Sequence, residues 1–229
     1  FETFSVPTAD TLFLLILSIL TLESAHSIRF LYQHFLSGIT EKSLNVFYYA
    51  CSYAKVDYSR FMNTTVRITL KLIPDSLQTQ PVFLCVDDTM VSKFGTKFEN
   101  VSKLFDHAAH NGSNYLNGHC FVSIMLCIPV WKNDRVSYLS LPLGYRMWQK
   151  KESKLELAAS MIRQVMPEFQ EKKQVIILCD SWYTKRNLVS IVDEYLNLDL
   201  IGNARIDSVM YAPAHTGRRG RPAKHGKRL

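Results

Sequence analysis

The sequence has 229 residues, with 27 lysines and arginines against 20 aspartates and glutamates, and 47% of it is hydrophobic. This length fits one large domain, or one domain with a small appendage, and the apolar fraction excludes a disordered or low-complexity protein. The five cysteines form no CxxC pair and mostly lie in apolar runs, which is typical of buried thiols in a reducing compartment. The apolar stretch Leu12–Leu22 has 11 residues, whereas a membrane span needs about 20. We therefore expect a soluble, intracellular protein without a membrane partner.

The net charge of +7 is concentrated at the C-terminal end. Six basic residues and no acidic one follow Ala212, and the rest of the chain carries 21 basic and 20 acidic residues. Lysine and arginine neutralise phosphates and release counterions, so this segment is suited to bind nucleic acid; a solvated tail is the alternative. The candidate DNA-binding residues are Arg218, Arg219, Arg221, Lys224, Lys227 and Arg228.

The first third of the chain has the apolar spacing of helices. Candidate N-cap residues precede three helices, at Asp10, Ser27 and Thr40, and Pro74 ends a fourth. The pattern predicts a helical N-terminal region over residues 1–75, whose role is either DNA binding or plain packing. The expected helices are Thr11–Leu22, Ile28–Leu36, Glu41–Ala54 and Tyr58–Leu72.

From Pro81 onward, short apolar runs predict strands, and Lys132-Asn133-Asp134 predicts the turn between the second and third. Three strands are followed by helix, strand, helix and strand. This is the chain order of the ribonuclease H-like fold, an α/β class with a mixed sheet in which three antiparallel strands precede α/β units. We assign this core to residues 81–229. Its expected strands are Val82–Val86, His119–Val130, Val136–Leu143, Val175–Cys179 and Leu198–Gly202, and its expected helices are Glu152–Met166 and Thr184–Leu196.

Aspartates follow two of these strands, Asp87 and Asp88 after the first and Asp180 after the fourth. These two strands are parallel neighbours in this fold, and parallel neighbours place their carboxyl ends at one edge of the sheet, where ligand sites lie. Converging carboxylates repel each other unless a cation is present, and Mg²⁺ takes such oxygen ligands. Two ions can then activate a water or a 3′-hydroxyl for attack on a phosphodiester. The alternative is that each aspartate only caps a turn or a helix.

Four segments that carry these and other polar residues stand out together. They are Val86-Asp87-Asp88-Thr89, Gly118-His119, Leu178-Cys179-Asp180-Ser181-Trp182-Tyr183 and Gly217-Arg218-Arg219-Gly220-Arg221-Pro222. In combination they resemble the DDE transposases of bacterial insertion sequences, over about residues 81 to 229. The resemblance implies a ribonuclease H-like core that cleaves and transfers DNA strands at insertion-sequence ends with two Mg²⁺ ions, for which Mn²⁺ substitutes.

The resemblance also implies roles for individual residues. Asp88, in an Asp-Thr pair, matches the first catalytic, metal-binding aspartate, and Asp180, in Cys-Asp-Ser, matches the second. Asp87, Trp182 and Tyr183 are accessory candidates; the two aromatic residues either stack on an exposed base or pack against the following helix. The implied partners are transposon ends, target DNA and a second copy of the chain, and the implied location is the nucleoid in the bacterial cytoplasm.

One part of the family pattern has no match. The third carboxylate of these transposases is a glutamate on a helix downstream of the second aspartate, and Glu194 comes too early to be its counterpart. We therefore expect a fragment, truncated on its C-terminal side, with little or no strand-transfer activity of its own. Two alternatives stay open: a nuclease on the same fold, and a decayed or domesticated transposase that only binds DNA.

Overall fold

The computed structural model describes residues 4–22, 27–95, 97–105, 114–204, 208–212, 214 and 226–228. The chain forms two compact units, Phe1–Thr65 and Val66–Leu229. The boundary between them falls inside helix α5 (Tyr58–Leu70), which matches the fourth helix expected from the sequence.

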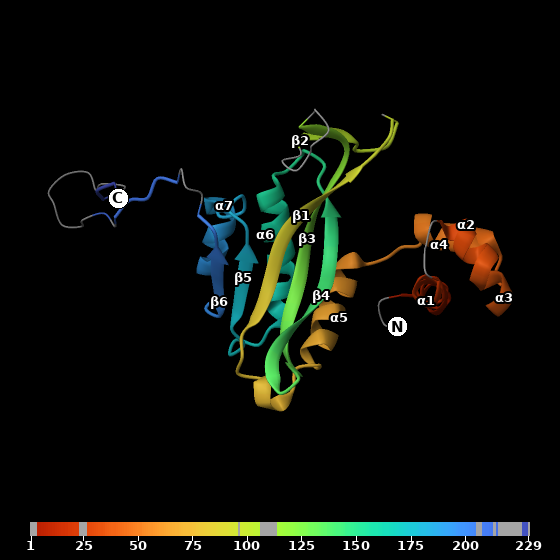
Figure 1. Cartoon of the computed structure of the whole chain (residues 1–229), viewed down its shortest axis with the longest axis horizontal. Coiled ribbons are helices and arrows are strands. Elements are labelled where there is room, and N and C mark those ends of the chain that lie inside the picture. Colours follow the sequence, from red (N-terminus) through yellow and green to blue (C-terminus); the bar gives the residue numbers. More distant parts are fainter. Residues whose placement is uncertain are drawn as a thin grey trace. The chain divides into compact units, whose positions relative to one another are not determined.

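The first unit consists of helices (Figure 1), and buried apolar side chains of these helices form one cluster. Leu15, Leu31, Leu36 and Phe47 are buried in this cluster, and each comes from a different helical segment. The first unit is therefore helical, while the bounds given to the N-terminal region, residues 1–75, stay a prediction. Its helices are α1 (Val6–Thr21), α2 (Ile28–Leu31), a π-helical turn (Tyr32–Leu36), α3 (Ser37–Ile39) and α4 (Leu44–Ser52).

Of the three predicted N-caps in this unit, only Ser27 is confirmed. Its hydroxyl accepts a hydrogen bond from the backbone N–H of Phe30 at 3.1 Å. Asp10 lies inside α1, which starts earlier because Pro7 is compatible with the first helical turn, where its missing N–H costs no hydrogen bond. Thr40 is not the N-cap of α4, which is Ser43; it is instead the C-cap residue of α3.

In the second unit, the described residues form one mixed sheet of six strands (Figure 1). β3 pairs antiparallel with β1 along one edge and with β2 and β4 along the other, whereas β5 pairs parallel with both β1 and β6. This is the ribonuclease H-like arrangement, so the predicted fold class is confirmed. The strands are β1 (Val82–Ser92), β2 (Ser102–Phe105), β3 (Tyr115–Lys132), β4 (Arg135–Met147), β5 (Val175–Cys179) and β6 (Leu198–Gly202).

The strands differ from the prediction mainly in length. β2 was not predicted, and β1 continues beyond Val86 to Ser92 because β3 pairs with it along this whole stretch. The turn between β3 and β4 is confirmed: Asn133 and Asp134 have φ angles of 50° and 57°. Two successive residues with positive φ form the type I′ turn, whose twist suits a two-residue hairpin.

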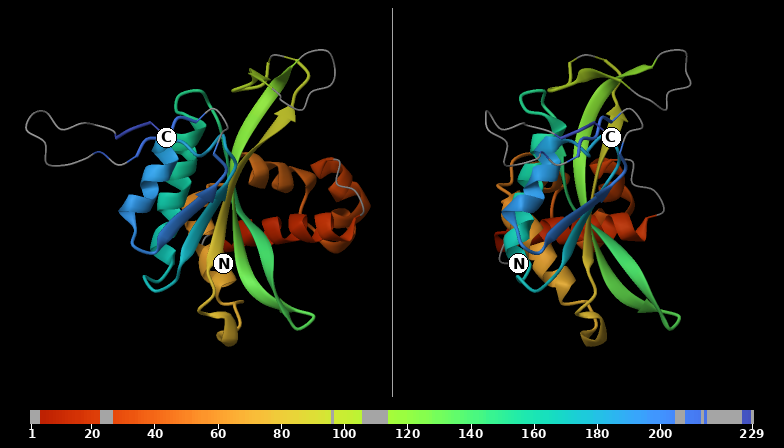
Figure 2. Two further views of the ribbon diagram at one scale, coloured as in Figure 1. Left: turned by 60° about the vertical axis from the view of Figure 1, so that its left-hand side comes forward. Right: turned by 90° about the vertical axis from the view of Figure 1, so that its left-hand side faces the viewer.

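Helices α6 (Lys154–Val165) and α7 (Arg186–Val189) lie beside each other on one face of the sheet (Figure 2). This is the face on which alternate residues of β1, namely Val82, Leu84 and Val86, are buried, as the period of two in a strand requires. The sheet and α6 therefore share one apolar core.

The second helix predicted after β4 is not continuous. Only α7 is α-helical, and the residues Ser190–Glu194 form a 3₁₀-helix. Leu188 of α7 and Ile191 of the 3₁₀-helix are both fully buried, so both parts of this segment pack into the core.

Composition led to two further expectations that the structure addresses. All five cysteines are free, as expected, although Cys51 is exposed rather than buried. Among the described residues, no helix is both long enough and apolar enough to cross a membrane.

Candidate active site

The parallel pairing of β1 with β5 brings three aspartates to one edge of the sheet. The paired residues end with Val86 opposite Cys179, so Asp87 and Asp180 come next, and Asp88 lies one position further. The expectation that these two strands are parallel neighbours is confirmed. β5 ends next to its aspartate, Asp180. β1, however, continues past Asp87 and Asp88, because it stays paired with β3 beyond them.

The two aspartates of β1 lie on opposite faces of the sheet. Asp88 shares the buried face with Leu84 and Val86, and its side chain is 17% exposed. Asp87 is exposed, and its Oδ1 accepts a hydrogen bond from the backbone N–H of Asp88 at 2.8 Å. Asp88 is therefore the one that faces the helix-covered side of the sheet.

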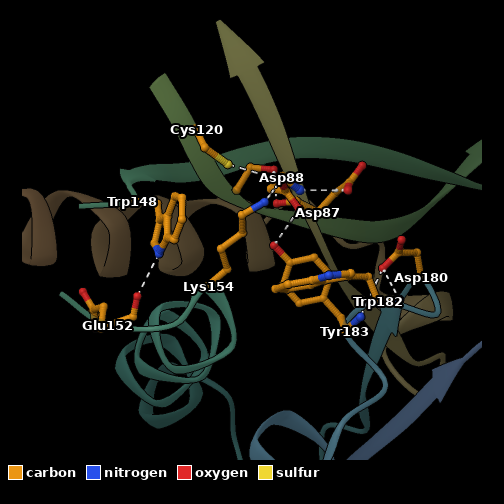
Figure 3. A network of polar contacts seen from close by, with 10 residues as sticks. Asp87, Asp88, Cys120, Trp148, Glu152, Lys154, Asp180, Trp182 and Tyr183 are labelled. Atoms are coloured by element: carbon orange, nitrogen blue, oxygen red, sulfur yellow. Dashed lines mark hydrogen bonds and ion pairs between the residues drawn. The ribbon is translucent and has the colours of Figure 1, made fainter. Parts of the chain in front are cut away.

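Three side chains donate hydrogen bonds to the Asp88 carboxylate (Figure 3). Its Oδ2 accepts from Nζ of Lys154 at 2.6 Å and from Sγ of Cys120 at 3.2 Å. Its Oδ1 accepts from the hydroxyl of Tyr183 at 3.2 Å. Because the donors come from α6, β3 and the turn after β5, this one carboxylate connects three elements.

Asp180 stabilises the turn that follows β5. Its Oδ1 accepts hydrogen bonds from the backbone N–H groups of Trp182 at 3.1 Å and of Tyr183 at 3.2 Å, a pattern by which aspartate side chains stabilise tight turns. The turn places the fully buried side chain of Tyr183 against Asp88. The two aspartates are therefore connected through this tyrosine (Figure 3).

Lys154 is the first residue of α6, and its ammonium group lies near aromatic rings as well as the carboxylate. Its Nζ is 5.7 Å from the ring centroid of Trp148 and 5.2 Å from that of Trp182. Lys185 lies over the same Trp182 ring, with its Nζ 4.3 Å from the centroid. The negative face of an aromatic ring attracts ammonium groups, so Trp182 borders the site beside two lysines.

The groups around Asp88 hold their protons more tightly than usual. Burial, followed by the hydrogen bond to Asp88, raises the pKa of the Cys120 thiol to about 11, and burial together with the Asp88 charge raises the pKa of Tyr183. Partial burial lowers the pKa of Lys154, but the hydrogen bond and charge of Asp88 outweigh this effect, so the pKa lies above its ordinary value. At neutral pH all three groups are therefore protonated and donate to the carboxylate.

The sequence matches the family described as DDE superfamily endonuclease over residues 52–229. The chain belongs to this family. No curated protein gives a significant match. Among solved structures, the chain is similar to the Mos1 strand transfer complex, at 13% identity and a TM-score of 0.28, and to the Mos1 transposase paired-end complex with left transposon end, at 12% identity and a TM-score of 0.29. These matches cover 87% and 86% of this chain, but it spans only 58% of the length of each Mos1 chain.

DDE endonucleases generally use divalent metal ions, and the donors at the sheet edge fit such an ion in their chemistry. Carboxylates are hard oxygen ligands, and Mg²⁺ needs only one or two of them besides water and phosphate. Asp88 and Asp180 are the residues that would hold it. In the part of the chain that the structure describes, no three His, Cys, Asp or Glu side chains gather at one point. Glu194 instead forms an ion pair with Arg163 at 2.6 Å.

Two members of the Asp88 network, Lys154 and Cys120, were not among the residues predicted from the sequence. One signal was available for Lys154, because the pattern Ser153-x-x-Glu156 is a capping box that places the lysine in the first turn of α6. For Cys120, the period of two along β3 predicts only that its side chain shares a face with alternate buried residues such as Val122. Neither pattern indicates which carboxylate the side chain contacts.

The predicted DNA-binding segment of this DDE endonuclease is described only in part. Lys227 and Arg228 are exposed, and Arg228 pairs with Tyr211 in an isolated antiparallel bridge. The other four predicted residues, Arg218, Arg219, Arg221 and Lys224, lie outside the described residues.

Proposed function

We propose that this DDE endonuclease cleaves and transfers DNA strands at the ends of a bacterial insertion sequence, with Asp88 and Asp180 as its metal-binding catalytic residues. The observation that carries the proposal is the register of β1 and β5, which brings both aspartates to one sheet edge. Membership of the DDE endonuclease family supports the class of reaction. Mg²⁺ is the proposed ion, in two copies, with Mn²⁺ as a substitute.

The bound ions would activate the attacking water or 3′-hydroxyl and stabilise the leaving oxygen. The chain's own residues orient the carboxylates. Hydrogen bonds from Tyr183 and Cys120 hold Asp88 in place, and two backbone N–H groups hold Asp180. Asp87, exposed beside Asp88, is proposed as an accessory residue.

DNA is the proposed partner, as transposon end and as target. The basic residues that follow Ala212 would bind its phosphates, and Trp182 and Lys185 border the site where the reacting strand would lie. We also propose that the protein acts as a dimer on paired transposon ends and is located at the nucleoid.

Asp87 lies on the opposite face of β1 from Asp88, and within the described residues no third side chain completes a metal-holding group with Asp88 and Asp180. We therefore expect cleavage by this chain alone to be weak.

The first test is Mn²⁺ binding to the 229-residue chain, measured from the electron paramagnetic resonance signal of free Mn²⁺. Replacing either proposed ligand, as Asp88→Asn or Asp180→Asn, should weaken binding by about tenfold or more, because each removes a charged ligand. Asp193→Asn, at an exposed aspartate of the same unit, is the matched control and should bind like the unaltered chain. Unchanged binding in either ligand variant would contradict the proposed site.

Nicking of supercoiled DNA and strand transfer then separate the alternatives. For the proposed function, any cleavage requires Mn²⁺ or Mg²⁺ and is lost in both aspartate variants. A nuclease on the same fold would cut without joining a 3′-hydroxyl to a new strand. A decayed transposase would bind DNA with a steep salt dependence, without cleavage, and its binding would be indifferent to Asp88→Ala and Asp180→Ala.

A further inference from the structure

The cation nearest to Asp88 belongs to the chain itself. Nζ of Lys154 lies 2.6 Å from Oδ2 of Asp88, and the side chains are 18% and 17% exposed. An exposed ion pair contributes little because water screens it, but this pair is largely shielded from solvent. The ammonium group therefore neutralises much of the charge that Asp88 would offer to a metal ion.

The remaining acceptor positions of this carboxylate are also partly filled. Cys120 donates to the same Oδ2, and Tyr183 donates to Oδ1. A carboxylate has about four lone-pair sites, so a metal ion has to share them with these donors. Cys120 and Tyr183 are neutral when protonated, whereas Lys154 carries a positive charge that opposes a second cation directly.

The position of Lys154 is set by the start of α6. The Ser153 hydroxyl accepts a hydrogen bond from the Glu156 N–H at 3.1 Å, and the Glu156 carboxylate accepts one from the Ser153 N–H at 2.8 Å. This capping box determines the first helical residue. The capping box therefore fixes the backbone position from which Lys154 reaches Asp88.

We propose that the Lys154 ammonium group lies where a divalent metal ion would bind Asp88, so that the two cations compete for this carboxylate. An ammonium group and a divalent ion that share one carboxylate oxygen would repel each other strongly. Metal loading therefore releases Lys154 from Asp88, and the nearby rings of Trp148 and Trp182 offer the released ammonium group favourable contacts. The inference rests on the proposed function, because it takes Asp88 as a metal ligand.

Mn²⁺ binding to the full chain without DNA tests the competition independently of activity. Lys154→Gln removes the competing charge and should bind Mn²⁺ about tenfold more tightly than the unaltered chain, a change of about 1.4 kcal/mol in binding free energy. Lys154→Arg keeps the competing charge, and because arginine also pairs well with a carboxylate, it should not gain the tighter Mn²⁺ binding of Lys154→Gln. Lys151→Gln, at an exposed lysine three positions earlier, should change nothing.

The variants distinguish failure of this inference from failure of the proposed function. If Asp88→Asn loses Mn²⁺ binding while Lys154→Gln binds equally or more weakly than the unaltered chain, competition is wrong and the metal site stands. If Asp88→Asn binds Mn²⁺ like the unaltered chain, the metal site itself is wrong. Circular dichroism and thermal unfolding establish that each variant is folded.

A second measurement needs no substitution. Brief labelling of the unaltered chain with an amine-reactive reagent, read by peptide mass spectrometry, compares Lys154 with Lys151 as an internal reference. Saturating Mn²⁺ should increase labelling of Lys154 several-fold relative to Lys151, since the amine leaves its shielded pair. Labelling that stays the same or falls while Mn²⁺ is bound would overturn the competition.

Discussion

At the scale of single residues, Asp88 differs from Asp87 only in what surrounds it. Lys154, Cys120 and Tyr183 all donate to Asp88, whereas Asp87 accepts the neighbouring backbone N–H and is exposed. The two share one residue type and are adjacent in sequence. The resemblance favoured Asp88 as the metal ligand, and that choice stays a proposal.

The hydrogen bond from Tyr183 to Asp88 provides a prediction at this scale. Tyr183→Phe removes the hydroxyl from a fully buried side chain, and the loss should lower the free energy of unfolding by about 1 kcal/mol. Urea denaturation followed by circular dichroism measures the change. Tyr138→Phe, at a tyrosine that is 38% exposed, is the control and should change stability by less than about 0.5 kcal/mol. An equal effect of both substitutions would argue against a stabilising contact at Asp88.

At the scale of elements, helix α6 connects the fold to the site. Its apolar side packs on the sheet through buried Leu155, Ala158, Ala159 and Ile162, and its first residue, Lys154, reaches Asp88. The sequence predicted the helix from its apolar spacing, with a start at Glu152. The capping box moves the start to Lys154, and this shift determines which side chain faces the carboxylate.

The capping box makes the stability of α6 depend on pH. The backbone N–H and then the hydroxyl of Ser153 lower the pKa of Glu156. A depressed carboxyl pKa stabilises the fold above the unfolded pKa, and that contribution is lost as pH falls through the folded value. Glu156→Gln should therefore be less stable than the unaltered chain at pH 7, and the difference should shrink below about pH 4. Thermal unfolding across this pH range measures it.

Loss of the other half of the box should be visible at neutral pH. Ser153→Ala is expected to lower the free energy of unfolding by about 1 kcal/mol, the usual cost of losing an N-cap side chain. Ser190→Ala, at an exposed serine of the same unit, should have little effect.

For Glu156→Gln, the difference in stability from the unaltered chain should not persist unchanged at pH 3. If it did, the capping role of the carboxylate would be wrong.

At the scale of the whole molecule, the charge is divided unevenly. Six of the 27 basic residues follow Ala212, and the remainder nearly balances the 20 acidic residues. Such a distribution confines electrostatic attraction for DNA mostly to one segment. The sheet edge would then supply the chemistry, and the basic segment most of the affinity.

This division predicts the salt dependence of DNA binding. Replacing all six basic residues after Ala212 by glutamine should reduce the slope of log affinity against log salt by up to about five, since each phosphate contact contributes about 0.9. Fluorescence anisotropy with labelled duplex DNA measures the slope. A control that replaces exposed basic residues of the body should alter it by less than about one; suitable positions are Lys55, Lys71, Lys132, Arg135 and Lys172. Equal effects in the two variants would contradict a binding role confined to the basic segment.

The sequence by itself determined the kind and order of most elements of this protein. Strands and helices are recognisable because their apolar periods of 2 and 3.6 are local properties, and the Asn133-Asp134 turn and the Ser27 cap depend on neighbouring residues alone. The order of these elements then indicated a ribonuclease H-like sheet, and with it that Asp88 and Asp180 would meet at one edge.

Only the tertiary structure decided the length of β1, the partners of Asp88 and the mixed helix after β5. Each depends on residues far apart in the chain: β3 extends β1 by pairing with it, and Lys154, Cys120 and Tyr183 come from three separate elements. No local pattern specifies which distant side chain a carboxylate will contact, because that contact is determined by how the elements pack.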